Sequence, residues 1–262
     1  MKRVARIGIP LIALFLLVPG VASAADAPPA GAPAPQTYSK DLYASSGVRY
    51  QDPDFTACVA ASTEMMLNMI ATNGSKGDGF RWVRSTSFVF QERILAWERA
   101  HHTQVSYHPG VDPHGWRNGL NYFGWGAYTD ARKAVYQDLS FLSYSAAVKG
   151  IVRAIARYDK PVAILGWAGG HAQFITGYVV TGQDPALSSD FTVDFVYLTD
   201  PLRADGKRDA KISDKAFRSG PSVTRFRPYA FTDSPRDDPY TAGTRTSYRE
   251  WFGLWVIVAP VR

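Results

Sequence analysis

The chain has 262 residues, with 29 basic and 23 acidic side chains, a formal net charge of +6 and an aromatic content of 13%. Three of the basic side chains, Lys2, Arg3 and Arg6, lie at the very start, and the remainder of the chain carries about +3. So modest a charge gives no argument for a nucleic-acid partner. The aromatic residues can build a substantial core, and the single cysteine, Cys58, excludes an internal disulfide.

Residues 1–24 have the pattern of a secretory signal peptide. The three basic residues precede an apolar run from Ile7 to Val18, and the tripeptide ASA fits a cleavage site after Ala24. This run is too short for a comfortable membrane span, and no later stretch is long enough either. We therefore expect a protein that is exported and released, secreted to the extracellular space, with no membrane partner once the signal is removed.

Residues 25–37 are rich in Ala and Pro, which is typical of an extended linker. The folded part is expected to run from Tyr38 to Arg262, a length compatible with one domain. No internal repeat is visible, and we expect a monomer.

The stretch from Gln51 to Ile70 predicts an amphipathic helix that begins near Cys58. Asp54 or Thr56 can serve as its N-cap, and apolar residues recur at helical spacing through residue 69. A thiol in the first turn lies at the positive end of the helix dipole, which favours the thiolate. An unused exposed thiol would be oxidised outside the cell, so the sequence favours a functional Cys58 over a buried, inert one.

Three more helices are predicted, over residues 87–100, 112–124 and 144–158. Asp112 followed by Pro113 is a strong helix start, and Ser143 or Ser145 can cap the last helix. The 144–158 segment has the clearest apolar stripe of the chain, which is typical of a helix packed on a core.

Four of the five histidines fall in a short loop-like region and suggest a zinc site; they are His101, His102, His108 and His114. Their spacing matches no familiar ligand pattern, and the motif HExxH is absent. We therefore expect a polar loop with no metal and no cofactor, and keep a structural or regulatory metal as the alternative.

From residue 161 the hydrophobic period changes to that of strands. Strands are predicted over residues 161–167, 171–180 and 191–200, with a weaker signal at 223–231 and a last strand at 253–260. A polar stretch, residues 202–220, separates the third strand from the weak signal. The order of elements indicates an α+β fold, with N-terminal helices packed on an antiparallel sheet.

Two strand ends carry side chains with catalytic chemistry. His171 opens one strand after a Gly-Gly turn, and Asp200 closes the next, so an antiparallel hairpin brings both to one rim of the sheet. The imidazole can take the Cys58 proton or share an ion pair with it, while the carboxylate fixes the ring. Gln51 can donate to an oxyanion beside the backbone N–H of Cys58.

This order of residues resembles the papain-like cysteine peptidases: a Gln, a Cys on a helix, GGH opening a strand and DP ending the next. More narrowly, the chain is similar to the bacteriocin-processing (double-glycine leader) peptidases and their stand-alone secreted relatives, over about residues 50–201. The resemblance implies a papain-like fold with Cys58 as nucleophile, His171 as general base and acid, Asp200 as the orienting group and Gln51 as oxyanion donor.

The sequence therefore predicts a secreted hydrolase that cleaves a peptide or related amide bond through an acyl-enzyme. The alternative is a catalytically inactive binding protein on the same fold, in the cell envelope or medium, because Val59 and Ala60 stand where those peptidases usually have Gly-Pro. A serine hydrolase and a nucleotide-binding protein are disfavoured, since G-x-S-x-G, the P-loop and G-x-G-x-x-G do not occur.

Overall fold

The computed structural model describes residues 35–43, 56–73, 76–102, 110–127, 129–130, 132–202, 208–230 and 250–262. The expected signal peptide, most of the expected linker and Gln51 lie outside these ranges. The elements in chain order are β1 Gln36–Asp41, α1 Cys58–Asn73, α2 Phe88–Ala100, α3 Pro113–Trp125, β2 Tyr136–Phe141, α4 Tyr144–Tyr158, β3 Val162–Gly166, η1 Trp167–Gly169, β4 His171–Gly182, β5 Phe191–Thr199, β6 Ala210–Ser213, α5 Asp214–Ser219, η2 Ser222–Thr224 and β7 Trp255–Pro260.

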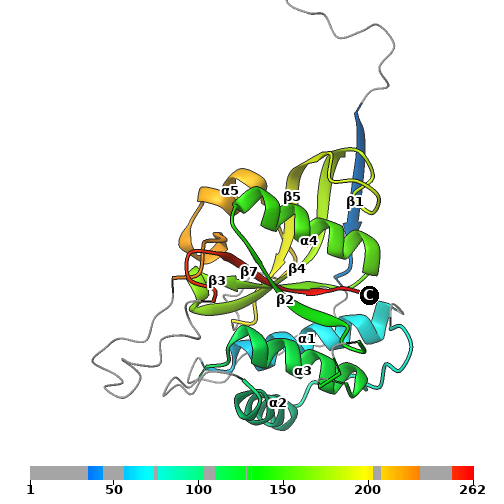
Figure 1. Cartoon of the computed structure of the whole chain (residues 1–262), viewed down its shortest axis with the longest axis vertical. Helices are drawn as coiled ribbons and strands as arrows, with labels where there is room; N and C mark the ends of the chain where they lie inside the picture. The colour runs from blue at the N-terminus through cyan, green and yellow to red at the C-terminus, as the bar shows by residue number, and fades with distance from the viewer. Residues whose placement is uncertain are drawn as a thin grey trace, which may run out of the picture. The chain divides into compact units, whose positions relative to one another are not determined.

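The described strands form one antiparallel seven-stranded sheet, with the order β2-β7-β3-β4-β5-β6 and with β1 paired to β4 (Figure 1). The long strand β4 pairs with β3, β5 and β1. Phe174 of β4 lies opposite Thr199 of β5, so the start of β4 and the end of β5 meet at one rim. A side chain at Gly177 would collide with the backbone oxygen of Lys40, which is why β1 can approach β4 there.

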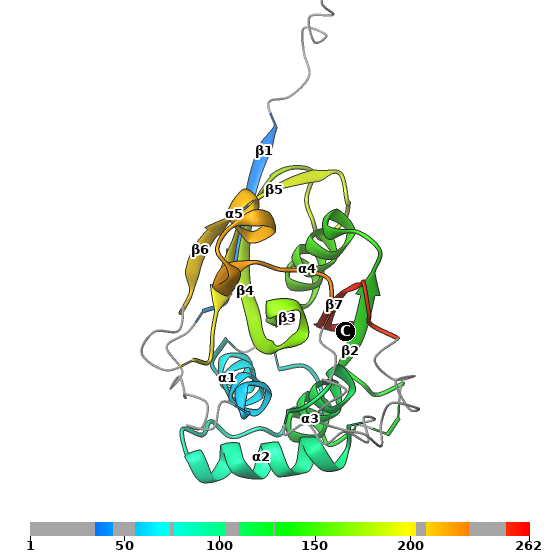
Figure 2. The ribbon, with the colours of Figure 1, turned by 90° about the vertical axis from the view of Figure 1, so that its left-hand side faces the viewer.

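Helices cover both faces of the sheet. One core lies between the sheet and α1, α2 and α3, and the second lies between the sheet and α4 and α5. Alternation along the strands divides the residues between them: Ala163 and Leu165 of β3 face the first core, whereas Val162 and Ile164 face the second. Figures 1 and 2 show α1 to α3 on one side and α4 and α5 on the other.

The helix α1 is the centre of the first layer. It contacts β4, α2 and α3, and every residue from Val59 to Ile70 is buried. The predicted amphipathic pattern is therefore wrong, because α2 and α3 cover the sides of α1 that the sheet does not. Two of its buried polar residues bind neighbouring segments: Asn68 accepts from Trp82 Nε1 at 2.9 Å, and Thr63 donates to Glu98 at 2.7 Å.

The predicted α+β class with an antiparallel sheet is confirmed, and so are the helices near 88, 113 and 144 and the strands of the hairpin. Asp112 caps α3 by accepting from Gly115 N, and Ser143 caps α4. The helix expected to stop at Gly124 continues to Trp125, where the left-handed Gly126 ends it. No helix among the described residues is long and apolar enough to cross a membrane.

Other parts of the prediction are wrong. The strands β1, β2 and β6 and the helix α5 were not predicted, and β1 begins at Gln36, two residues before the expected start of the domain. The polar stretch 202–220 contains β6 and α5. The weak strand signal that begins at 223 is a short 3-10 turn followed by isolated bridges as far as it is described, to residue 230.

Asn121 of α3 joins the helical layer to the edge of the sheet. Its side chain is 1% exposed; Oδ1 accepts from the backbone N–H groups of Val135 and Tyr136 at 2.8 and 2.9 Å, and Nδ2 donates to Tyr136 O at 2.8 Å. One amide thus satisfies three buried backbone groups at the start of β2.

We expect Asn121→Ala to lower the free energy of unfolding by about 2–4 kcal/mol, because it leaves buried donors and an acceptor without partners. Chemical denaturation measures the loss. Asn118→Ala, on the same helix, removes two part-buried hydrogen bonds, one to His101 O and one from Arg117 Nε, whose partners water can reach, and should cost about 1 kcal/mol or less. Equal losses in the two variants would contradict the role given to Asn121.

Candidate active site

Cys58 is the first residue of α1, at the edge of the first core; the residue is partly exposed, but its sulfur is buried among its neighbours. The sulfur is hydrogen-bonded to the His171 side chain and to the backbone of Ala172 and Val59. Burial opposes ionisation of the thiol and is the largest single influence, but these hydrogen bonds and the charge of His171 together lower its pKa below the ordinary value. The expected nucleophile is therefore poised towards the thiolate.

His171 begins β4 and lies between the sulfur and a carboxylate. Its side chain is 3% exposed, and Nε2 is 2.8 Å from Asp200 Oδ1, which leaves Nδ1 to face Cys58. Burial lowers the pKa of the imidazole, yet the hydrogen bonds and charges of Asp200 and Cys58 outweigh burial and raise it to about 9. A thiol with a lowered pKa beside an imidazole with a raised one favours the thiolate–imidazolium ion pair at neutral pH.

Asp200 follows β5 directly and is 3% exposed. Besides His171, its oxygens accept from the backbone N–H of Leu202 at 2.8 Å and from Gln173 Nε2 at 2.7 Å. Gln173 also donates to Val223 O at 2.9 Å. These donors hold the carboxylate towards the imidazole ring.

Gln173 is a functional candidate that the sequence analysis missed. It lies two positions after His171, so the strand period places both side chains on one face of β4, and that was the available signal. Its Oε1 lies against Gly166 of β3, where a side chain would collide with it. The pairing of β3 with β4 thus makes the space that the amide occupies.

The backbone before His171 is strained. Trp167, Ala168 and Gly169 have φ angles of 51, 60 and 103°, and a bulky side chain with positive φ is unusual. The Trp167 ring lies 4.4 Å from the His171 ring, and Trp167 is 41% exposed. Such strain is held in place by its surroundings and gathers at functional sites, and here it keeps an exposed aromatic ring against the imidazole.

A buried carboxyl lies on the helical side of Cys58. Glu98 of α2 is 0% exposed and accepts from Thr63, and Gly119 of α3 has no side chain that would collide with it. Burial raises its pKa well above the ordinary value, against the Thr63 hydrogen bond, and the charge of Cys58 raises it further. Burial thus favours the protonated form of Glu98 far more than in an exposed carboxyl, and a negative charge on Cys58 favours it further.

The other predicted site residues are placed as follows. Gln51 and Asp54 lie outside the described residues, as does His108. Thr56 accepts a hydrogen bond from Arg99 at 2.9 Å. His101 stacks on Trp97 at 3.8 Å. Among the described residues, the group with metal-ligand chemistry is His114, Asp138 and Glu250.

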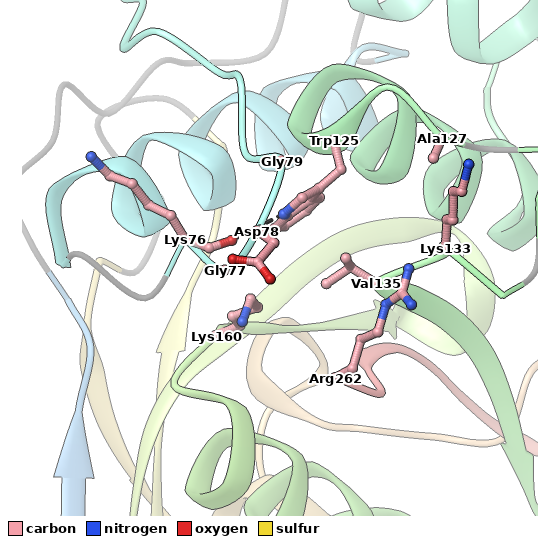
Figure 3. A pocket seen from close by; sticks show the side chains of 10 residues that line it. All are labelled: Lys76, Gly77, Asp78, Gly79, Trp125, Ala127, Lys133, Val135, Lys160 and Arg262. Atoms are coloured by element: carbon pink, nitrogen blue, oxygen red, sulfur yellow. Dashed lines mark hydrogen bonds between the residues drawn. The ribbon is translucent and has the colours of Figure 1, made fainter.

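A basic cavity of about 470 Å³ lies beyond the other end of α1 (Figure 3). It is lined by Lys76, Gly77, Asp78, Gly79, Trp125, Ala127, Lys133, Val135, Lys160 and Arg262. Burial lowers the pKa of Lys160, against the charge of Asp159. Since α1 has 16 residues, its two ends are on the order of 24 Å apart, so this cavity is separate from Cys58.

Comparisons of the chain with known protein families, with curated proteins and with solved structures found no match. The site consists of a thiol at a helix start, an imidazole and a carboxylate in one hydrogen-bonded chain.

Alkylation of Cys58 by iodoacetamide should proceed at pH values at which an ordinary thiol is protonated, because the thiol pKa is lowered. We expect His171→Ala to move the rise in rate to higher pH, since both the hydrogen bond and the positive charge are lost. Mass spectrometry of the peptide that contains Cys58 measures the rate. His101→Ala removes an imidazole elsewhere and should leave the profile unchanged.

The pKa shifts of His171 and Cys58 change the free energy of unfolding with pH in opposite directions. The raised pKa of His171 contributes stability that is complete below about pH 6.5 and is lost as pH rises through about 9. The lowered pKa of Cys58 contributes stability that is complete above about pH 8.5 and is lost as pH falls through the folded-state pKa.

The alkylation experiment also tests the ion pair directly. If the alkylation rate of the wild type depended on pH as that of the denatured chain does, the ion pair would be contradicted.

Gln173→Glu should destabilise the protein by about 2–4 kcal/mol at neutral pH, because it places a second buried carboxylate against Asp200. The loss should shrink at acid pH, where the two carboxyls share a proton. Gln183→Glu is a matched control, since Gln183 donates to Asp190 in an exposed pair and water screens the added charge. Chemical denaturation at several pH values gives the free energy of unfolding of both variants. If the loss in Gln173→Glu did not depend on pH, the contact between Gln173 and Asp200 would be ruled out.

Proposed function

We propose that this protein is a secreted cysteine hydrolase that cleaves a peptide or related amide bond on a papain-like fold. The observation that carries the proposal is the hydrogen-bonded chain from the Cys58 sulfur through His171 to Asp200. Cys58 starts a helix packed on an antiparallel sheet, His171 starts a strand, and Asp200 directly follows the next strand. The peptidases that the sequence resembles have the same order.

The reaction follows from the ion pair. The Cys58 thiolate adds to the substrate carbonyl carbon, and a C–S bond forms while the carbonyl π electrons move to oxygen. The imidazolium of His171 gives its proton to the leaving nitrogen as the C–N bond breaks, which leaves an acyl-enzyme. His171 then takes a proton from water as the water oxygen forms a C–O bond to the acyl carbon; the adduct collapses, the C–S bond breaks, and the acid product leaves with the thiolate and imidazolium restored.

The other residues have positioning roles in this proposal. Asp200 holds the imidazole, and Gln173 and Leu202 hold Asp200. The backbone N–H of Cys58 and the side chain of Gln51 are proposed to donate hydrogen bonds to the substrate oxyanion. The role of Gln51 comes from the resemblance. The exposed Trp167 offers an aromatic surface to the substrate beside the reacting atoms.

The inactive binding protein is the competing proposal, and the site itself favours the enzyme. A cysteine with only a packing role would be enclosed by apolar groups, whereas Cys58 is partly exposed and shares an ion pair with a buried imidazole. Secretion is proposed from the signal-peptide pattern of residues 1–24, and the substrate class is a peptide or amide.

An activated ester, p-nitrophenyl acetate, tests the chemistry without knowledge of the substrate, and a set of quenched fluorescent peptides tests the bond. We expect the chain from residue 25 onward to show an initial burst and turnover, with one acetyl group on Cys58 seen by mass spectrometry. Cys58→Ala and His171→Ala should each lower turnover by about 1,000-fold or more while circular dichroism stays unchanged.

Ser145→Ala, an exposed hydroxyl on α4, is the control and should keep full activity. Equal turnover in the wild type and Cys58→Ala would exclude the cysteine mechanism. Acetylation of Cys58 without release of acetate, together with no peptide cleavage, would favour the binding protein.

A further inference from the structure

A second group of side chains converges away from the thiol. His114 comes from the first turn of α3, Asp138 from the middle of β2, and Glu250 from the segment just before β7. His114 Nε2 is 3.3 Å from Asp138 Oδ2 and 3.5 Å from Glu250 Oε1, and all three donor atoms lie within 4.8 Å of one another. Three distant parts of the chain thus bring one imidazole nitrogen and two carboxylate oxygens together.

The separations fit metal coordination better than direct ion pairs. Charge-assisted hydrogen bonds between nitrogen and a carboxylate are about 2.7–2.9 Å long, so 3.3 and 3.5 Å are long for them. Ligand atoms at about 2.0–2.2 Å from a tetrahedral metal are about 3.3–3.6 Å from each other. The two distances from His114 Nε2 match this separation between ligand atoms. The third distance, between the Asp138 and Glu250 oxygens, can shorten if the half-exposed Glu250 changes its rotamer.

The surroundings make the group rigid on one side and open on the other. The His114 ring packs on the fully buried Trp251 at 4.8 Å, and the Asp138 side chain is 8% exposed. Arg117 binds Asp138 Oδ1, which fixes the carboxylate and turns Oδ2 towards His114. The Glu250 side chain is 52% exposed, so an ion can enter from solvent.

We propose that His114, Asp138 and Glu250 bind one divalent metal ion. One imidazole with two carboxylates suits a borderline or hard cation of the Mn²⁺, Fe²⁺ or Zn²⁺ class, with water in the remaining positions. The ion would join α3, β2 and the segment that leads into β7. This proposal does not depend on the chemistry of Cys58, and it replaces the sequence-based expectation that the histidines bind no metal.

Arg117 provides the competing explanation and also a way to separate the two. Without a metal, the group is an ion-pair cluster in which Arg117 and a protonated His114 balance the two carboxylates. With a metal, Arg117 stays on Asp138 Oδ1 and holds Oδ2 towards the ion. Removing Arg117 should therefore weaken metal binding, whereas a cluster that never binds metal would show no Mn²⁺ binding in either chain.

Titration with Mn²⁺, followed by loss of the free-ion signal in electron paramagnetic resonance, tests the site on the whole folded chain. Mn²⁺ is chosen because carboxylates suit it and thiolates do not, so the Cys58 and His171 pair competes little. We expect one Mn²⁺ per chain in the wild type and in Cys58→Ser alike.

The variants decide which residues hold the ion. Binding should weaken by about tenfold or more in His114→Ala and in Glu250→Gln, and by about tenfold in Arg117→Gln, which loses the group that holds Asp138 in place. Glu92→Gln, an exposed carboxylate on α2, is the matched control and should bind as the wild type does. Since Glu250 is half exposed, its variant keeps the test valid even if His114→Ala unfolds.

Two results would overturn the proposal. One is no loss of the free Mn²⁺ signal in the wild type at a large excess of ion. The other is binding that both His114→Ala and Glu250→Gln leave unchanged, which would make the bound ion adventitious.

Discussion

The hydrogen-bonded chain from Cys58 through His171 to Asp200 is the constraint on which the site depends. It joins the start of α1, the start of β4 and the residue after β5, so the sheet and the helical layer must dock in one register for the three groups to meet. Because all three are largely withdrawn from water, each needs its partner: a buried imidazolium without the carboxylate, or a buried thiolate without the imidazolium, would be costly.

The helical layer shows the same dependence on paired polar groups. The helix α1 carries polar residues that are fully buried, and two of them find partners in neighbouring segments: Asn68 with Trp82, and Thr63 with Glu98. These contacts fix the position of α1 against α2 and the segment before it, and with it the position of the thiol at the start of α1. A helix held only by apolar packing would leave that position less well defined.

The hairpin could be predicted because its signals are local. Alternating apolar residues, the Gly-Gly turn before His171 and the proline after Asp200 mark where β4 and β5 begin and end, and antiparallel pairing then brings the two ends together. The prediction for α1 had the right start and the wrong environment. Its spacing fits one apolar face, but the covering by α2 and α3 is not encoded in any window around Cys58.

The sequence by itself determined the residue types at the site and the ends of the elements that carry them, since helix starts, strand period and turn residues act over a few positions. Tertiary structure decided what those residues touch. The amide of Gln173 against Asp200, the buried Glu98 against Thr63 and the convergence of His114 with Asp138 and Glu250 all join segments far apart in the chain. Their partners are set by how sheet and helices pack, which no local pattern specifies.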